Sequence, residues 1–150
     1  MKKKFSVLVN NKIKKFDQTI TAESDKSISH RTLLIASQCI GASNIYNILE
    51  SEDVMNTIAC LKKLGVKILK KNKGYIVFGN GLSSFKKPKK NFLYAGNSGT
   101  LVRMLFALLG TQSNLKIRVA GDSSLNKRDM KRIIEPLSKI GCNFFPKNKT

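Results

Sequence analysis

The sequence contains an internal repeat, which limits the possible folds more than any other feature of the chain. When residues 53–65 are placed over residues 129–141, Asp, Ile, Leu, Lys and Gly recur at matching positions. An earlier segment matches in a similar way, so that Arg31 falls on Arg103 and Ile45 falls on Ile117. The two alignments differ slightly in their offset, and a loop can absorb this difference. A repeat of this size indicates stacked supersecondary units of the same kind.

Hydrophobic periodicity and breaker residues predict alternating helices and strands in both units. The first unit is predicted to contain helices over 27–40 and 52–64 and strands over 44–48, 66–69 and 75–78. The second unit is predicted to contain helices over 98–109 and 129–140 and strands over 92–94, 115–119 and 142–145. Two earlier strands, over 5–9 and 12–17, are expected to form a hairpin. The expected fold class is α/β (α+β). Because the second unit stops before its final hairpin, we expect the chain to be incomplete.

The chain is strongly basic, with 28 Lys and Arg against 9 Asp and Glu and a formal net charge of +19. Such an excess is typical of proteins that bind nucleic acid, because basic side chains displace counterions from phosphates. Only five of these residues are Arg, however, and the Lys residues cluster in segments that are expected to be exposed. We therefore favour a solvated surface enriched in Lys and Asn by compositional drift over a nucleic-acid-binding face. An anionic substrate would need only a few of these side chains.

The cysteine and histidine residues do not indicate a metal site. Cys39, Cys60 and Cys142 lie far apart, and no pair of them has the spacing of metal ligands. His30 is the only histidine, so a His-based metal site or a Ser-His-Asp triad would depend on that residue alone. No apolar run reaches the roughly 18 residues that span a bilayer, and charged residues interrupt the N-terminal segment before a secretory signal can form. We therefore expect a cytoplasmic protein.

Three polar segments, each at or next to a predicted helix start, are the candidates for chemistry. They cover residues 25–31, 94–103 and 121–128, and each contains an arginine beside hydroxyl, amide or glycine residues. The free N–H groups of a first helical turn attract anions, and nearby ammonium or guanidinium groups would complete a phosphate or carboxylate site. Three such helix starts would suit a substrate with more than one anionic group. The alternative for each segment is a capped helix or polar loop with exposed basic side chains.

The same three segments resemble motifs of the 3-phosphoshikimate 1-carboxyvinyltransferase family, the EPSP synthases. The matching motifs are Asp-Lys-Ser-Ile-Ser-His-Arg (25–31), Gly-Asn-Ser-Gly-Thr-x-x-Arg (96–103) and Gly-Asp-x-Ser-Leu-x-x-Arg (121–128). They cover only the N-terminal part of the family's sequence. The resemblance implies a two-domain enzyme in which repeated α/β units form an inside-out barrel, incomplete in this chain. Residues 1–24 would then be initial strands of the other, C-terminal domain, and residues 25–150 would form about two of three repeats of the substrate-binding domain.

The resemblance also implies a reaction. The family transfers the enolpyruvyl group of phosphoenolpyruvate to the 5-hydroxyl of shikimate 3-phosphate by addition and elimination, and releases phosphate. It belongs to the shikimate pathway of aromatic amino acid biosynthesis, uses no metal or organic cofactor, and is the target of glyphosate. The complete enzyme is expected to be a monomer that acts on these two small molecules and binds neither nucleic acid nor a membrane. The family's acidic proton-transfer residues lie in later sequence, so this chain alone is expected to be inactive.

The family's functional residues can be carried over where the motifs match. Lys26, Ser27 and Arg31 would bind shikimate 3-phosphate, and Lys26 would also reach phosphoenolpyruvate as the catalytic residue of this segment. The residues expected on the phosphoenolpyruvate side are Asn97, Gly99 and Arg128, with Arg103 in support. The family usually has proline after the arginine that matches Arg128, whereas this chain has Asp129. Aspartate also suits a helix N-terminus, so the fold should tolerate it, but its charge lies beside an expected substrate contact.

Two other functions are the alternatives. The sister enzyme that transfers enolpyruvyl to UDP-N-acetylglucosamine shares the fold, but its motif pairs Lys with Asn where this chain has Lys26 and Ser27. A basic nucleic-acid-binding module would need aromatic side chains among the Lys clusters. Most aromatic residues of this chain occupy predicted strands instead.

Overall fold

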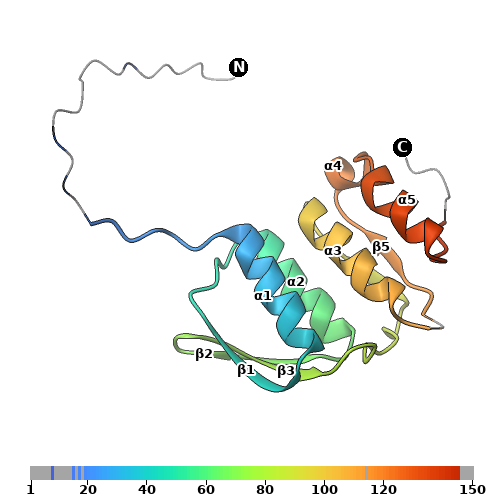
Figure 1. The fold of residues 1–150 in the computed structure, drawn as a ribbon, viewed down its shortest axis with the longest axis horizontal. Helices are drawn as coiled ribbons and strands as arrows, with labels where there is room; N and C mark the ends of the chain where they lie inside the picture. Colours follow the sequence, from blue (N-terminus) through green and yellow to red (C-terminus); the bar gives the residue numbers. More distant parts are fainter. Residues whose placement is uncertain (1–7, 9–14, 16, 18, 114, 146–150) are drawn as a thin grey trace.

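The computed structural model describes residues 8, 15, 17, 19–113 and 115–145. Apart from single positions, the hairpin strands expected over 5–9 and 12–17 lie outside the described residues. Residues 19–25 form an extended segment without helix or strand that leads into the first helix (Figure 1). The elements after this segment form two successive units, which follow the two copies of the sequence repeat.

The first unit is a three-stranded sheet with two helices on one face (Figure 1). Its elements are α1 (Lys26–Gln38), β1 (Ile40–Tyr46), α2 (Glu52–Lys63), β2 (Lys67–Lys71) and β3 (Gly74–Asn80). The strand order is β1-β3-β2, and both pairings are antiparallel. Tyr75 and Val77 on β3 are buried and alternate with less buried residues, because successive side chains of a strand point to opposite faces. The buried face packs against the two helices.

The second unit has a two-stranded parallel sheet and three helices. Its elements are β4 (Phe92–Tyr94), α3 (Gly99–Gly110), β5 (Arg118–Ala120), α4 (Ser123–Asn126) and α5 (Lys131–Lys139). Leu93 on β4 lies opposite Val119 on β5, and α3 connects the two strands, as a helix commonly does between parallel strands. On one side α3 contacts α1, and on the other it contacts α5 (Figure 1). The first contact joins the two units.

The predicted helices are confirmed, with shifted boundaries. The helix expected over 27–40 ends at Gln38, because β1 already begins at Ile40. Gly41, which the sequence pattern places directly after the predicted helix, therefore lies inside β1 and pairs with Gly79. Glycine is needed at position 79 because a side chain there would collide with backbone carbonyl oxygens at the C-terminal end of α1. The sequence pattern alone does not show this close approach of helix and sheet.

The second unit differs from its predicted pattern in two places. The four-residue helix α4 is not among the predicted elements, and the chain over 142–145 forms no strand. In the first copy of the repeat, the equivalent strand β2 pairs with β3. Among the described residues of the second unit, no strand corresponds to β3. Residues 142–145 therefore lack the neighbour that a strand needs for its hydrogen bonds.

One apolar core runs through both units. Its fully buried side chains include Leu33, Val54, Leu61, Leu64, Val77, Leu93, Leu101 and Leu105. Each side chain of this size contributes roughly 1.5–3 kcal/mol when it is removed from water. Within the described part of the chain, no helix has the length and the apolar character that crossing a membrane requires.

Candidate functional site

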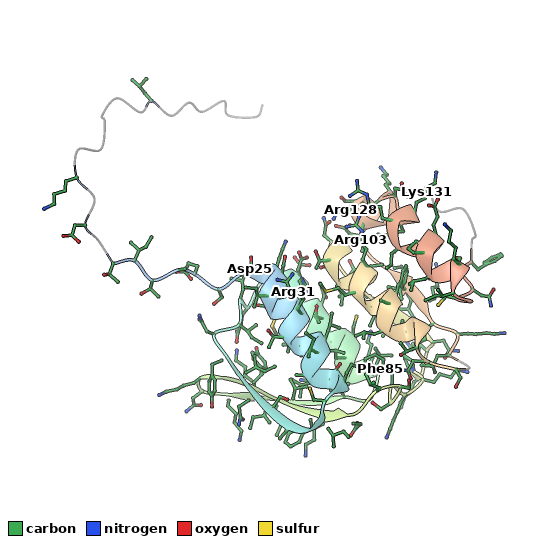
Figure 2. All side chains as sticks on the ribbon, in the orientation of Figure 1. Asp25, Arg31, Phe85, Arg103, Arg128 and Lys131 are labelled. Carbon is green, nitrogen blue, oxygen red and sulfur yellow. The ribbon has the colours of Figure 1, made fainter. Side chains whose placement is uncertain are left out.

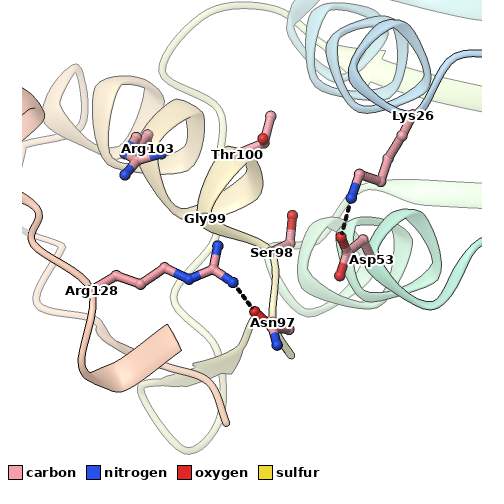
Figure 3. Close-up of a pocket in the computed structure, with 8 residues that line it drawn as sticks. All are labelled: Lys26, Asp53, Asn97, Ser98, Gly99, Thr100, Arg103 and Arg128. Atoms are coloured by element: carbon pink, nitrogen blue, oxygen red, sulfur yellow. Dashed lines mark hydrogen bonds and ion pairs between the residues drawn. The ribbon is translucent and has the colours of Figure 1, made fainter. Parts of the chain in front are cut away.

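The N-terminal ends of α1, α2 and α3 meet at a pocket of about 410 Å³ (Figure 3). The pocket is lined by Lys26, Asp53, Asn97, Ser98, Gly99, Thr100, Arg103 and Arg128. Its volume falls within the range of small-molecule sites. Three basic side chains against one carboxylate give the lining a formal excess of two positive charges. The pocket is therefore suited to a small anion.

Two guanidinium groups converge on the first residue of α3. A methyl group in place of a hydrogen of Gly99 would lie 3.1 Å from Nη1 of Arg128 and 3.5 Å from Nη1 of Arg103. Arg128 also donates a hydrogen bond to the amide oxygen of Asn97 (Figure 3). Among the described residues, no carboxylate forms an ion pair with either arginine. Nε of Arg103 is buried and has no hydrogen-bond partner in this part of the chain.

Lys26 lies on the opposite side of the pocket and is paired. Its ammonium group contacts the carboxylate of Asp53 at 2.9 Å, so the first residue of α1 is joined to the first turn of α2 (Figure 3). The Lys26 side chain is half exposed and that of Asp53 is 19% exposed. Such a partly exposed pair contributes little to stability. It does hold the ammonium group in place at the edge of the pocket.

The caps of the helices distinguish the three predicted anion-binding segments. Asp25 caps α1 and accepts a hydrogen bond from the N–H of Ile28 at 2.6 Å. Asp122 caps the short helix α4 in the same way. Of these three, only α3 has a neutral cap, Ser98, which accepts from the N–H of Leu101 at 3.2 Å. Carboxylates of the chain therefore cap α1 and α4, whereas the start of α3 has no negative charge of its own.

The pocket unites four of the six predicted site residues, namely Lys26, Asn97, Gly99 and Arg128, together with Arg103. Ser27 and Arg31 are on α1 but do not line this pocket. Ser27 is half-buried and is not the helix cap, whereas Arg31 is exposed. Figure 2 shows Arg103 and Arg128 together at one end of α3, with Arg31 on the neighbouring α1.

Three lining residues were not predicted to belong to the site: Asp53, Ser98 and Thr100. Ser98 and Thr100 are next to Gly99 in the sequence, and this position within the motif could have indicated that they line the site. The signal for Asp53 is its match with Asp129 in the repeat, but that match does not show which helix α2 faces. The contact with Lys26 depends on how α1 and α2 pack. Sequence periodicity does not reveal such packing.

Asp129 does not neutralise Arg128. Its carboxylate accepts a hydrogen bond from the backbone N–H of Lys131 at 2.7 Å, at the beginning of α5. The expectation that aspartate would suit this helix start is confirmed. The guanidinium group of Arg128 turns to Asn97 instead.

Other reactive groups of the described chain do not form a second chemical site. No group of three His, Cys, Asp or Glu residues in the described part of the chain is arranged to hold a metal ion. Burial raises the pKa of the Cys60 thiol to about 11, so this thiol stays protonated and unreactive at neutral pH. Burial also lowers the pKa of His30 below its usual 6.5, with the Asp53 carboxylate opposing this shift and the Lys26 ammonium group assisting it.

Comparison with known proteins assigns this arrangement to a family. The family model described as EPSP synthase (3-phosphoshikimate 1-carboxyvinyltransferase) matches residues 10–150. Among curated proteins, the 3-phosphoshikimate 1-carboxyvinyltransferase of Syntrophomonas wolfei is 42% identical over 135 residues, which are 90% of this chain and 31% of the relative. The protein of the same name from Caldicellulosiruptor saccharolyticus is 44% identical over 131 residues, 87% of this chain and 30% of the relative.

A solved structure shares the fold. The EPSP synthase from Acinetobacter baumannii superimposes with a TM-score of 0.75 and 34% sequence identity, over 85% of this chain and 29% of that protein. The chain thus spans about 30% of the length of the relatives that it matches. The described helices and strands form an open arrangement of α/β units, as the expected fold class requires.

Proposed function

The chain belongs to the EPSP synthase family, and we propose that its pocket is part of the active site that transfers the enolpyruvyl group of phosphoenolpyruvate to shikimate 3-phosphate. One observation carries this proposal. Arg103 and Arg128 converge on the N-terminus of α3 without a carboxylate partner among the described residues, while the paired Lys26 faces them across the same pocket. This is an arrangement for a small molecule with several negative charges.

We assign the phosphoenolpyruvate side to the α3 half of the pocket. The guanidinium group of Arg128 can form two parallel hydrogen bonds with a phosphate or carboxylate. The hydrogen bond from Arg128 to Asn97 holds that group over Gly99. The absence of a side chain at Gly99 lets an anion approach the first N–H groups of α3, which attract negative charge. A methyl group at this position would lie 3.1 Å from Nη1 of Arg128, so the guanidinium group would have to shift to make room.

We assign the shikimate 3-phosphate side to the start of α1. Ser27 and Arg31 lie four residues apart, so they are neighbours on the helix surface. Lys26 precedes them and lies at the pocket edge, where it can contact both substrates. Ser27 and Arg31 lie beyond the pocket lining, which fits a second, larger substrate that extends along α1.

The contribution of these residues to the reaction is electrostatic and geometric. Two anionic substrates repel each other, and preorganised cations and helix N–H groups offset that repulsion while they hold the reacting groups close together. Of the site residues, Lys26 is the one that reaches both halves. Its ion pair with Asp53 fixes the position of the ammonium group.

Titration of the protein with each substrate at fixed salt concentration tests the proposal. We expect Lys26→Ala and Arg31→Ala each to weaken shikimate 3-phosphate binding about ten- to a hundredfold, because a hydrogen bond to a charged group is worth about 1.5–3 kcal/mol. Lys62→Ala, which removes an equally exposed charge at the far end of α2, serves as the control. Unchanged affinity in both variants would return the start of α1 to a capped helix with exposed basic side chains.

A further inference from the structure

His30 is a fully buried polar residue that the proposed reaction does not use directly. Its side chain is 0% exposed and lies between three helices. Nδ1 lies 2.6 Å from the hydroxyl oxygen of Thr57 on α2, and Nε2 lies 3.2 Å from the hydroxyl oxygen of Ser98 at the start of α3. Thr57 and Ser98 are themselves 0% and 2% exposed. The imidazole ring therefore joins α1 to both neighbouring helices.

Both ends of this hydrogen-bonded chain reach the pocket. Thr57 donates to the backbone carbonyl oxygen of Asp53 at 3.3 Å, and Asp53 holds the ammonium group of Lys26. At the other end, Ser98 caps α3 and lies between the pocket residues Asn97 and Gly99. His30 thus connects the half of the pocket that contains Lys26 with the half that contains the neutral helix start.

The hydroxyl groups assign the direction of the hydrogen bonds. Directing the Thr57 hydrogen to the carbonyl oxygen of Asp53 selects the tautomer in which Nδ1 of His30 carries the proton and donates to Thr57. Nε2 then accepts from the hydroxyl group of Ser98, whose oxygen remains available to the N–H of Leu101. The ring nitrogens and both hydroxyl groups all have partners when the imidazole is neutral.

The repeat shows that packing alone does not require histidine here. The alignment that places Arg31 on Arg103 also places His30 on Val102, which is 4% exposed in α3. An apolar side chain therefore fills the equivalent position of the second unit. The polar connection exists only where α1 faces both the ion pair and the start of α3.

From these contacts we propose that His30 is a positioning residue, which sets the spacing between Lys26 and the α3 start so that one substrate can contact both. This inference rests on the proposed function. A ligand that contacts both halves depends on their spacing, whereas a ligand that contacts one half does not. Small displacements within a site weaken the first kind of interaction strongly.

The test compares phosphoenolpyruvate with inorganic phosphate by titration of the protein. We expect His30→Leu to weaken phosphoenolpyruvate binding about tenfold or more, in keeping with the large cost of misplacement, and to change phosphate binding little. His30→Gln, which keeps a donor and an acceptor, should restore most of the affinity. Thr57→Val removes one arm of the connection without changing side-chain shape and should act in the same direction as His30→Leu.

Ser37→Ala is the matched control, because Ser37 is also 0% exposed on α1 but hydrogen-bonds only within that helix, to the carbonyl oxygen of Leu34 and the side chain of Gln38. This variant removes a buried hydroxyl group away from the pocket and should leave the ratio of the phosphoenolpyruvate and phosphate affinities unchanged. An unchanged ratio in both His30→Leu and Thr57→Val would overturn the positioning role.

A measurement without ligand separates this inference from the proposed function. If the unmodified protein bound neither ligand, the proposed function would fail, and amide hydrogen exchange would decide the role of His30. Faster exchange at Leu101 and Val102 in His30→Leu, relative to α2, would support the positioning role, and unchanged exchange would refute it. Because His30 is the only histidine, the nitrogen resonances of its ring can also be assigned without ambiguity. A proton on Nε2 instead of Nδ1 would contradict the connection as described.

Discussion

The two units share a repeat, but the charges at the starts of their first helices differ. Those of α1 are paired within the chain, and those at α3 have no carboxylate partner among the described residues. In α1 the cap is the carboxylate of Asp25, and the next residue, Lys26, is paired with Asp53. In α3 the cap is the hydroxyl group of Ser98, and the first turn contains no acidic residue. Two guanidinium groups lie over this second helix start. The first unit therefore neutralises its own charges, whereas the second leaves positive charge available for a ligand.

This difference arises from a few positions of a common scaffold. When Arg31 is aligned with Arg103, Asp25 falls on Asn97, Lys26 on Ser98, and Ser27 on Gly99. At these three positions the second unit replaces charged or larger residues by neutral and smaller ones. The repeat supplies two similar helix starts side by side, and the substitutions make them complementary. One holds a cation that is paired within the chain, and we propose that the other binds an anion.

The largest expected effect concerns the stability of the two scaffolds. Leu33 and Leu105 occupy equivalent positions of α1 and α3, and both are 0% exposed. Substitution of each by alanine should lower the free energy of unfolding by about 2–5 kcal/mol, because a cavity remains. We expect the larger loss for Leu33, since it packs beneath a three-stranded sheet, whereas several neighbours of Leu105 on α3 are only half-buried. Urea denaturation measures both values. A larger loss of unfolding free energy for Leu105→Ala than for Leu33→Ala would contradict the expectation that the first unit is the more tightly packed one.

The next effect concerns the free positive charge of the second unit. Arg128→Ala should weaken phosphoenolpyruvate binding about ten- to a hundredfold, because it removes a charged hydrogen-bond donor worth about 1.5–3 kcal/mol. Arg132→Ala deletes an exposed charge on α5 and serves as the control. Calorimetric titration at one salt concentration provides the comparison. Equal losses in the two variants would mean that only net charge matters and that the helix start is not special.

A single substitution can make the second unit resemble the first. Asn97→Asp introduces the residue found at the equivalent position 25, and the new carboxylate would pair with Arg128 in nearly the same volume. We expect phosphoenolpyruvate binding to weaken about tenfold, because one charge-assisted bond is lost to an internal partner. Asn72→Asp adds the same charge at the exposed turn between β2 and β3, and it should leave binding unchanged. Affinity that survives Asn97→Asp would show that Arg128 is not a ligand contact.

The smallest effect is a pH dependence specific to the first unit. Burial lowers the pKa of His30 from 6.5, so below this pH the unfolded chain binds a proton that the folded chain resists. Stability from this residue is therefore complete above pH 6.5 and is lost as the pH falls toward the folded-state pKa. We expect His30→Gln to remove this part of the pH dependence, measured as the midpoint of thermal unfolding across neutral and mildly acidic pH. If the unfolding midpoint changed with pH in the same way in His30→Gln and in the unmodified protein, the effect of His30 burial would be contradicted.

The repeat and the motifs predicted most of the fold and part of the site. Family membership is confirmed, and the helices were predicted from apolar spacing, which is a local property of the chain. The motif spacing also brought Lys26, Asn97, Gly99 and Arg128 together, although their roles stay predictions. These residues belong to short segments that a resemblance can recognise.

The missing parts depend on contacts between distant residues. The ion pair with Asp53 requires α1 and α2 to lie side by side, which no local pattern encodes. Asp25 caps α1, so the helix begins at Lys26, one residue before its predicted start. Residues 142–145 have the sequence pattern of a strand, but no described strand lies beside them to pair with. Local sequence patterns therefore predict the secondary structure that a segment favours, and contacts with distant residues decide whether that structure forms.

The strand order β1-β3-β2 also bears on the order in which the chain acquires its structure. β2 and β3 are joined by two residues, so their pairing closes a very short loop and can form early. Pairing of β1 with β3 closes a longer loop and is expected later, because α2 and β2 lie between them in sequence. All strands of this sheet are nevertheless complete by Asn80. During synthesis, the first unit can thus be assembled while the second is still emerging, and it would offer α3 a preformed surface on which to dock.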